Sequence, residues 1–317
     1  MGFFIGMDEA GYGPNLGPLV ITATLWEVPD DPRQFDFWKV MEPFVTQSPI
    51  KNDPRLHIAD SKKVYSPSRG LSALERSVLM TLQLGNIIPR TLHQLANQLT
   101  FDENFSLDVE PWFFECDLEL PLTREIPQKE FSLFENWQQH CNHAGVQLHA
   151  VKSDIVLTER FNKLVQQYNN KALALSHCSL QLLSQLWDKQ TEEQILIVAD
   201  KHGGRNRYDD LLATIVNEDD MVFCHEEGKV LSRYSLRQSE IRFQTKAEEH
   251  FPVAVASMVC KYVRELSMEL FNRFWQKQIP HLKPTKGYPQ DARRFKQEIS
   301  EQQQQLNIPE KQLWRTR

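Results

Sequence analysis

The sequence predicts an α/β domain in which a mixed β-sheet is flanked by helices. Residues 3–8 and 195–199 are short, continuous apolar runs, which are typical of strands covered on both faces. Residues 19–28 are rich in β-branched side chains, which suit a pleated strand. Apolar residues at helical spacing separate and follow these strands, and this order of elements supports an α/β domain.

The first two predicted strands surround a glycine-rich turn. The strand at 3–8 ends at Asp8, and Glu9 follows it. The turn occupies 11–18, and the strand at 19–28 comes next. Two strands joined by such a turn are expected to form an antiparallel hairpin. The hairpin would present the two acids at the end of the sheet.

The next part of the chain has fewer periodic patterns. Five prolines over 29–54 indicate a loop with one short helix, and 71–84 is predicted to be a helix that Gly85 ends. Residues 101–148 are acidic and are interrupted by aromatic side chains. We interpret this stretch as an insertion or small subdomain.

Strands and helices alternate again in the second half. We predict a strand at 147–157, then a long helical stretch capped by Thr158 and Glu159, and a central strand that ends at Asp200. Residues 222–246 are predicted to be strand material.

The last third is predicted to be helical and then polar. Pro252 suits the first turn of a helix that runs to about Trp275. Four glutamines at 302–305 lie in a polar tail with a basic end. The predicted division is a main domain over 1–100 and 149–295, an insertion over 101–148, and the tail over 296–317.

Composition excludes several classes of protein. The 317 residues suit one enlarged domain or two small ones, and 12 glycines and 17 prolines are too few for a collagen or a wholly disordered chain. No apolar run reaches the roughly 18 residues of a membrane helix. Asp8 lies where a signal peptide would be basic, so we expect a cytoplasmic protein without a membrane partner. Five widely spaced cysteines without a Cys-x-x-Cys pair argue against a disulfide framework and a zinc site.

The net charge of −6 is unevenly distributed. Taken alone, it speaks against a protein that coats nucleic acid nonspecifically, because such binding requires Lys and Arg at phosphates. Residues 101–148, however, carry ten acids and two bases, a charge of −8, so the rest of the chain totals +2. Neutralising a few of its acids with bound cations would make that remainder suitable for a phosphate-rich partner.

Three acids lie where predicted strands end. Asp8 and Asp200 follow apolar strands, and Glu248 lies between a strand and the helix that begins near Pro252. Sites gather at strand ends in open α/β sheets, and carboxylates are the ligands that Mg²⁺ prefers. The alternative is that each acid caps a helix, pairs with a lysine or is solvated. Spacing alone does not decide between these interpretations.

Several motifs occur in the order found in one enzyme family. They are Asp8-Glu9-Ala10-Gly11-Tyr12-Gly13-Pro14 with Gly17-Pro18, Asp60-Ser61-Lys62-Lys63, Phe161-Asn162 with Asn170-Lys171-Ala172-Leu173, Asp200, Thr245-Lys246-Ala247-Glu248 with Val255-Ala256-Ser257, and Lys286-Gly287-Tyr288. Together they resemble the type 2 ribonucleases H, the ribonuclease HII and HIII group. The second half is most similar to the HIII branch. The resemblance implies a ribonuclease H-like α/β fold with an insertion.

The same resemblance implies an activity and a catalytic set. The catalytic, metal-binding residues would be Asp8, Glu9, Asp200 and Glu248, with Glu249 as a rival for the fourth position. The implied reaction is endonucleolytic hydrolysis of the RNA strand of an RNA–DNA hybrid, giving 5′-phosphate and 3′-hydroxyl ends, with two Mg²⁺ or Mn²⁺ ions. Because neighbouring strand residues face opposite ways, Asp8 and Glu9 would share the site only if the strand bends at Glu9.

The alternatives are a hybrid-binding protein on this fold without turnover, and a metal-dependent nuclease that acts on another nucleic acid. Retention of all four carboxylates disfavours the pure binding protein, since negative charge beside phosphates weakens binding.

Substrate contacts are also implied by the resemblance. Backbone groups of Gly11, Tyr12 and Gly13 would contact the 2′-hydroxyl that distinguishes RNA from DNA, and Tyr288 would stack on a sugar. Ribonuclease HII has arginine where this chain has Tyr12. That departure leads us to expect a preference for longer hybrids over single embedded ribonucleotides. An ordinary turn or surface role for both tyrosines is the alternative.

Phosphate contacts are expected from basic residues. The candidates are Lys62, Lys63, Lys246, and Lys261 with Arg264 three positions apart on the long helix. Ser61 of the second motif is a further substrate-binding candidate. The basic loop at 201–207 is either a mobile loop at the site or a plain connection, and His202 in it is a further candidate for proton transfer.

Overall fold

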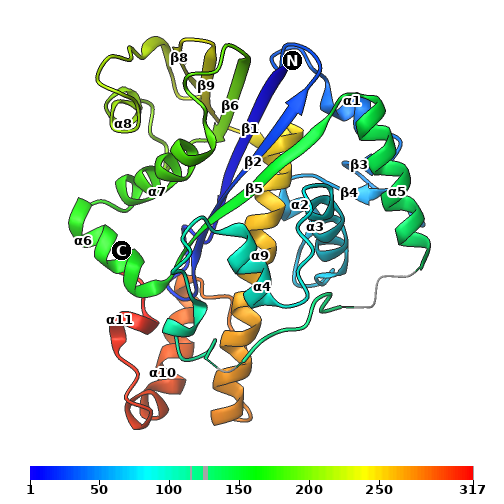
Figure 1. The fold of residues 1–317 in the computed structure, drawn as a ribbon. Coiled ribbons are helices and arrows are strands. Elements are labelled where there is room, and N and C mark those ends of the chain that lie inside the picture. The colour runs from blue at the N-terminus through cyan, green and yellow to red at the C-terminus, as the bar shows by residue number, and fades with distance from the viewer. Residues whose placement is uncertain (115, 124–127, 317) are drawn as a thin grey trace.

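A computed structural model describes residues 1–114, 116–123 and 128–316, and it has a seven-stranded mixed sheet at its centre (Figure 1). The sheet order is β5-β2-β1-β6-β9-β8-β7. These strands are β1 Gly2–Ala10, β2 Leu19–Val28, β5 Gln147–Val156, β6 Gln194–Asp200, β7 Phe223–Glu227, β8 Leu231–Leu236 and β9 Ser239–Gln244. The predicted hairpin is confirmed, since β1 and β2 pair antiparallel, whereas β6 runs parallel to both β1 and β9. The predicted α/β class is therefore confirmed.

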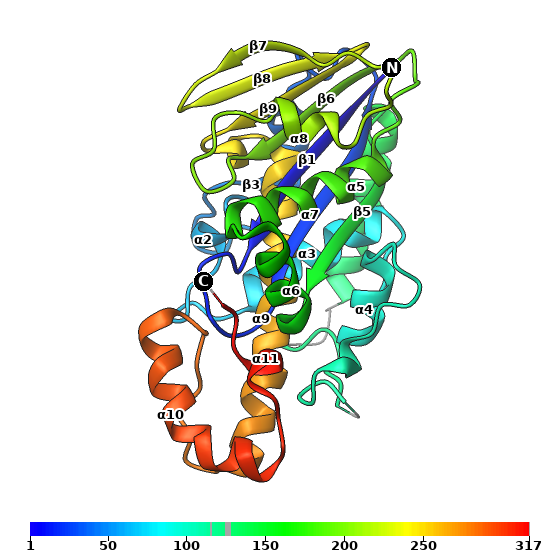
Figure 2. The same ribbon diagram turned by 90° about the vertical axis from the view of Figure 1, so that its left-hand side faces the viewer.

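Helices cover both faces of the sheet (Figures 1 and 2). One face carries α9 Phe251–Gln278 with α2 Ser61–Val64, α3 Ser72–Leu84, α4 Leu92–Leu99 and α5 Gln128–His143. The other carries α6 Thr158–Tyr168, α7 Lys171–Leu186 and α8 Asp209–Ala213. The remaining elements are α1 Phe37–Met41, the short strands β3 Val45–Thr46 and β4 Leu56–His57, the 3₁₀ turns η1 Leu107–Val109 and η2 Ala247–Glu249, α10 Pro289–Gln305 and α11 Glu310–Leu313. Among the described residues, no helix has both the length and the apolar character to cross a membrane.

The central strands contribute to two separate cores. In β1, Phe4 packs into the core on the α9 face, whereas Ile5 and Met7 pack into the core on the α7 face. This alternation follows from the two-residue period of a strand. It also determines the face to which each acid at the end of the sheet belongs.

Gly6 is the point where β1 touches α9 most closely. A Cβ atom built on Gly6 would lie 2.4 Å from the carbonyl carbon of Pro252 and 2.5 Å from the amide nitrogen of Val253. Both are backbone atoms, which cannot move aside as a flexible side chain does. The sheet and the long helix can therefore approach this closely only because residue 6 has no side chain.

Gly6→Ala should therefore destabilise the fold by roughly 1–3 kcal/mol, because α9 must move away from β1. The measurement is the free energy of unfolding in urea. Gly13→Ala is the matched control, since its Cβ would meet nothing within 4 Å. Equal stability of the two variants would show that the β1–α9 contact is not tight.

The described part of the acidic stretch at 101–148 packs into the main hydrophobic core. Trp112, Phe113 and Trp137 are all buried in the cluster that includes α9. The Trp112 ring meets the Phe271 ring edge-on with centroids 4.8 Å apart. The predicted domain boundaries stay a prediction, but these aromatic side chains form no core of their own.

The predicted long helix after Thr158 is divided into two, and its predicted cap is wrong. Asn169 adopts φ 46° and ends α6, and the Asn170 side chain then caps α7. At the start of α6, the Thr158 N–H donates to Glu110 Oε1 at 2.8 Å. A carboxylate 48 positions earlier in the chain thus provides the negative charge that a helix N-terminus favours.

The described part of the polar stretch at 296–317 is largely helical. The glutamines at 302–305 lie in α10, whose Phe295 and Ile299 are buried against α9. In the basic end of this stretch, Arg315 is only 1% exposed. Phe295 and Ile299 lie four positions apart on one face of α10, which explains why this helix packs against α9.

Candidate active site

The ends of two parallel strands bring Asp8 and Asp200 together. Met7 pairs with Ala199 across β1 and β6, so the residues that follow them occupy equivalent positions on neighbouring strands. Such strands lie about 4.8 Å apart. Alternation along both strands places Asp8 and Asp200 on the α9 face of the sheet, because Met7 and Ala199 pack into the α7 core.

Glu248 joins these two acids from η2, directly after β9. Lys246 adopts the left-handed conformation, with φ 58°, and turns the chain from β9 into η2. Repulsion from Glu248 acts on both Asp8 and Asp200. Glu248 is half-buried and its neighbour Glu249 is exposed.

Glu9 is placed differently from the other three acids. The bend expected at Glu9 does not interrupt the strand register, because pairing with β2 continues through Ala10. Alternation therefore directs Glu9 to the α7 face, where its charge acts on Tyr12. Asp8 and Asp200 nevertheless repel it, so it lies at the border of the same cluster.

The carboxylates shift one another's protonation. Burial raises the pKa of Asp8 to about 7. Hydrogen bonds from Ser257 and the Glu9 N–H lower this pKa, whereas repulsion from Asp200 and Glu248 raises it further. Burial also raises the pKa of Glu9, with repulsion from Asp8 and Asp200. Asp200 has a raised pKa as well, from burial and then from Glu248. Close carboxylates with raised pKa values are typical of sites that bind cations.

Lys62 is a motif cation whose charge acts on this cluster. Burial lowers its pKa, but the charges of Asp60, Asp8, Glu248 and Asp200 outweigh burial and raise it. Asp60 caps α2 by accepting the Lys62 N–H, which fixes the start of this short helix. Lys63 is exposed on the same helix.

Asp8 is tied to the long helix and, through it, to the second motif. Ser257 on α9 donates a hydrogen bond to Asp8, and the Cys260 thiol donates to the Asp8 carbonyl at 3.1 Å. The Ser257 and Ser61 hydroxyl oxygens lie 3.1 Å apart, and the Ser61 N–H donates to Ser257 Oγ at 3.4 Å. Ser61 is therefore a buried link between α2 and α9, and its role as a substrate contact stays a prediction.

The donor chemistry of Asp8, Asp200 and Glu248 fits a divalent cation, since all three offer hard oxygen ligands and Glu248 repels both aspartates. Within the described part of the chain, no three His, Cys, Asp or Glu side chains are gathered around one point as they would be around an ion. Side-chain rotation is therefore required before these carboxylates can share a cation.

The glycine-rich turn is fixed to the Lys-Gly-Tyr segment. The Asn15 N–H donates to the Gly287 carbonyl at 2.8 Å, which joins positions 272 residues apart. Gly11 and Gly287 have φ values of 92° and 79°, which favour glycine. A Cβ on Gly287 would lie 2.5 Å from the Leu16 carbonyl oxygen. The two motifs therefore form one surface only because both contain glycine.

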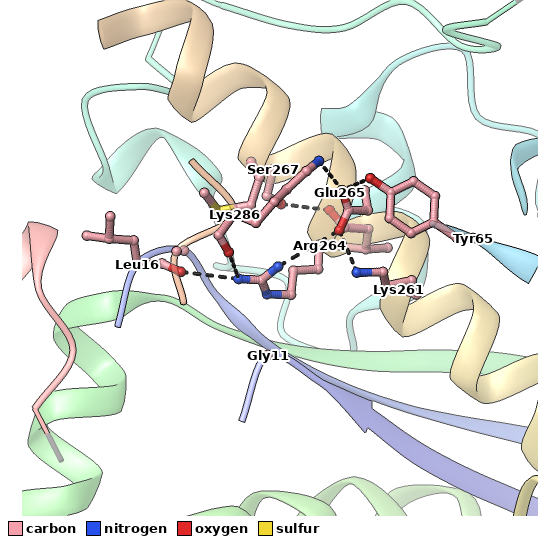
Figure 3. A network of polar contacts seen from close by, with 12 residues as sticks. Gly11, Leu16, Tyr65, Lys261, Arg264, Glu265, Ser267 and Lys286 are labelled. Atoms are coloured by element: carbon pink, nitrogen blue, oxygen red, sulfur yellow. Dashed lines mark hydrogen bonds and ion pairs between the residues drawn. The ribbon is translucent and has the colours of Figure 1, made fainter. Parts of the chain in front are cut away.

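A buried ion cluster supports this surface from the side of α9 (Figure 3). Glu265 accepts from Lys261 at 2.6 Å, from Lys286 at 2.5 Å and from the Tyr65 hydroxyl at 2.7 Å. Burial raises its pKa, but the two lysines outweigh burial and lower it to about 2. Lys261 is thus paired with Glu265 and not free in this structure, while its contact with phosphate stays a prediction.

Arg264 is also not available to phosphate. It is only 1% exposed, and its Nη2 donates to the Lys286 carbonyl at 2.9 Å and to the Leu16 carbonyl at 3.3 Å (Figure 3). Both carbonyls belong to the motifs that meet at the glycine-rich turn. The spacing of Lys261 and Arg264 placed both on one helix face, but it did not reveal that this face is covered.

The two tyrosines of the motifs flank this surface. Tyr288 is 54% exposed and begins α10 as its N-cap residue. Tyr12 is half-buried, with the Lys171 Nζ 4.5 Å from its ring centroid. An exposed ring at Tyr288 is free to stack on a ligand, whereas the Tyr12 side chain is engaged with α7.

The loop after Asp200 is anchored at its base. Lys201 is buried and its Nζ donates to the Gly228 carbonyl at 2.7 Å and to Ser232 Oγ at 2.9 Å. His202 is buried as well, and burial with repulsion from Arg205 lowers its pKa to about 3. Because His202 stays neutral, the proposed proton-transfer role is not supported.

Sequence reasoning missed residues whose partners are distant in the chain. Glu265 had one signal, its spacing of four from Lys261. Ser257 was noted in a motif without a role. Arg315 had no signal, because nothing in the sequence indicates that it reaches the glycine-rich turn.

Similarity to known proteins is found at the level of structure. No family model and no curated protein matches this chain. The chain is similar to a ribonuclease HII solved in complex with PCNA from Archaeoglobus fulgidus, at 14% identity and TM-score 0.42, covering 99% of this chain and 94% of that one. It is also similar to ribonuclease H2 from Pyrococcus horikoshii, at 14% identity and TM-score 0.43, covering 98% of this chain and 92% of that one. A third similar structure is a Bst-RNase HIII in complex with Mn²⁺, at 16% identity and TM-score 0.39, covering 86% of this chain and 55% of that one. These proteins carry the names of the group that the sequence motifs resemble.

Proposed function

We propose that this chain is a metal-dependent endonuclease of the type 2 ribonuclease H kind. It hydrolyses the RNA strand of RNA–DNA hybrids and leaves 5′-phosphate and 3′-hydroxyl ends. The observation that carries the proposal is the mutual repulsion of Asp8, Asp200 and Glu248, of which the first two lie at the ends of neighbouring parallel strands and the third lies in η2. The motif resemblance supports it.

The proposed ligands are Asp8, Asp200 and Glu248, with Glu9 at the border of the cluster. Mg²⁺ or Mn²⁺ bound there would activate water and stabilise the leaving 3′-oxygen. The carboxylates hold the cations, and Lys62, whose charge already interacts with three of these acids, lies ready for a phosphate oxygen. Lys63 is an exposed second contact on α2.

Selection for RNA is assigned to the glycine-rich turn. Backbone N–H groups of Tyr12 and Gly13 and the backbone of Gly11 are proposed to bind the 2′-hydroxyl, since glycine permits close approach. The exposed Tyr288 ring stacks on a neighbouring sugar in this proposal. The engaged Tyr12 side chain replaces an arginine of ribonuclease HII, and we propose that longer hybrids are preferred to single ribonucleotides.

The test is cleavage of labelled duplexes in Mg²⁺ or Mn²⁺. The expected result is cutting of the RNA strand in an RNA–DNA hybrid, with little cutting of double-stranded RNA or DNA. Binding of hybrid without cleavage would instead indicate a binding protein, and equal cleavage of DNA would overturn the selection for RNA. A duplex with one ribonucleotide tests the preference for longer hybrids.

Glu248 and Glu249 provide a matched pair of variants within this test. Glu248→Gln should lower hybrid cleavage by at least about 100-fold, because metal-site substitutions of even supporting residues cost 10–100-fold. Glu249→Gln, at an exposed neighbour, should cleave at the wild-type rate. The reverse pattern would assign the fourth ligand to Glu249.

A further inference from the structure

Arg315 is buried behind the glycine-rich turn, although it lies outside all of the sequence motifs. Its Nη1 donates to the Gly11 carbonyl at 2.6 Å and to the Gly17 carbonyl at 3.3 Å. The guanidinium carbon lies 3.8 Å from the centroid of the Phe161 ring, which packs beneath it. One side chain thus joins both ends of the turn.

The backbone around Arg315 is held in place as firmly as its side chain. The Arg315 N–H donates to the Asn15 carbonyl at 2.9 Å, and Asn15 Nδ2 donates back to the Arg315 carbonyl at 3.1 Å. Asn162 binds the flanking residues, donating to the Trp314 carbonyl at 2.9 Å and accepting from the Thr316 N–H at 2.8 Å. Residues 314–316 therefore form a fixed strap across the back of the turn.

The contact with the Gly11 carbonyl has a geometric consequence for the next residue. The carbonyl of Gly11 and the N–H of Tyr12 belong to one planar trans peptide, so they point in opposite directions. A donor that holds the carbonyl at the back of the turn therefore directs the Tyr12 N–H to the front. Gly11 alone, with φ 92°, would leave this peptide free to rotate.

Stability does not account for a buried arginine at this position. Among the described residues, Arg315 Nε and Nη2 have no hydrogen-bond partner, and the nearby Arg264 repels the charge. Glu110 attracts it and offsets part of this cost. A buried charge with unmet donors is less stable than an apolar side chain of similar volume. Features that lower stability in this way are expected at functional sites.

We propose that Arg315 is a positioning residue that orients the Gly11–Tyr12 peptide so that the Tyr12 N–H meets the ribose 2′-hydroxyl. This inference rests on the proposed function and adds a residue that no motif includes. RNA and DNA offer the same phosphates, whereas only RNA offers a 2′-hydroxyl. In this proposal the Gly11–Tyr12 peptide contacts the 2′-hydroxyl and no phosphate. Loss of Arg315 should therefore reduce the discrimination between RNA and DNA more than it reduces overall binding.

The test compares Arg315→Met with wild type. Selectivity, the ratio of kcat/KM for an RNA–DNA hybrid to that for a DNA duplex of the same sequence, should fall about fivefold to tenfold, the worth of one hydrogen bond. The loss should appear with the hybrid and not with the DNA duplex, because only the hybrid offers the 2′-hydroxyl, whereas the lysine contacts to phosphate remain in both. The melting temperature should be unchanged or raised. Arg273→Met is the control, since Arg273 is an exposed arginine of α9 paired with Glu269.

Two further measurements keep the outcome decisive. The affinity of Arg315→Met for hybrid and for DNA duplex, measured in a Glu248→Gln background, should show the same loss of discrimination without any cleavage. Arg315→Ala should recover part of its selectivity when guanidinium is added below denaturing concentrations.

The outcomes separate the inference from the proposed function. Unchanged selectivity in Arg315→Met, or a uniform loss of rate that follows a lower melting temperature, overturns the positioning role. If wild type cleaves nothing, the proposed function fails, and the affinity ratio still decides the role of Arg315. If Arg315→Met does not fold, recovery in Arg315→Ala decides it.

Discussion

Asp200→Asn should lower cleavage of an RNA–DNA hybrid by at least about 100-fold while the protein remains folded. The amide has the shape of the carboxylate but lacks the negative charge with which Asp200 and Asp8 attract a divalent cation. The site should therefore lose its cation and not its structure. Single-turnover cleavage at saturating Mg²⁺ measures the first effect, and the melting temperature measures the second.

The control for this variant is Asp188→Asn, which makes the same chemical change at an exposed acid after α7. It should cleave like wild type. Asp200→Asn cleaving close to the wild-type rate would show that Asp200 is no ligand. A large fall in its melting temperature would show that Asp200 serves the fold.

Asp8→Asn should stabilise the metal-free protein at neutral and alkaline pH. The folded-state pKa of Asp8 is about 7, against an ordinary value of 3.8, so the folded protein binds more protons than the unfolded chain between these values. Stability from this group is therefore highest at low pH and falls as pH rises from about 4 to about 7. Asparagine cannot ionise, so Asp8→Asn does not lose this stability as the pH rises.

The measurement is the free energy of unfolding in urea with a chelator present, for wild type and Asp8→Asn across the same pH range. The two should agree near pH 4, and the variant should gain steadily until about pH 7 and then stay ahead. Added Mg²⁺ should stabilise wild type alone and reduce the difference. A constant difference at all pH values would contradict the raised pKa. Glu249→Gln should follow wild type throughout.

Much of the fold was predictable because it depends on local patterns. The hairpin of β1 and β2, the central strand ending at Asp200 and the start of α9 beside Pro252 all follow from periodicity and turn residues. The division of the predicted helix at Asn169 was missed, because a left-handed residue does not interrupt the apolar pattern. The cap from Glu110 was missed because it comes from another part of the chain.

The candidate site was predictable to the extent that strand ends determine it. Asp8 and Asp200 were identified because each follows an apolar strand, and parallel strands end at the same edge. Glu9 shows the limit of that argument, since continued pairing with β2 directs it to the opposite face. Lys261 and Arg264 show another limit, because spacing indicates a helix face but not what covers it.

The α/β class and the strand-end positions of Asp8 and Asp200 follow from local patterns in the sequence, since both depend on apolar runs that form strands. Only the tertiary structure decided that Arg264 and Arg315 lie buried behind the glycine-rich turn, and that Glu265 pairs with the lysines. These contacts join residues up to 304 positions apart. Local propensity carries no information about such pairs, because they form only when the closed fold brings both partners out of water.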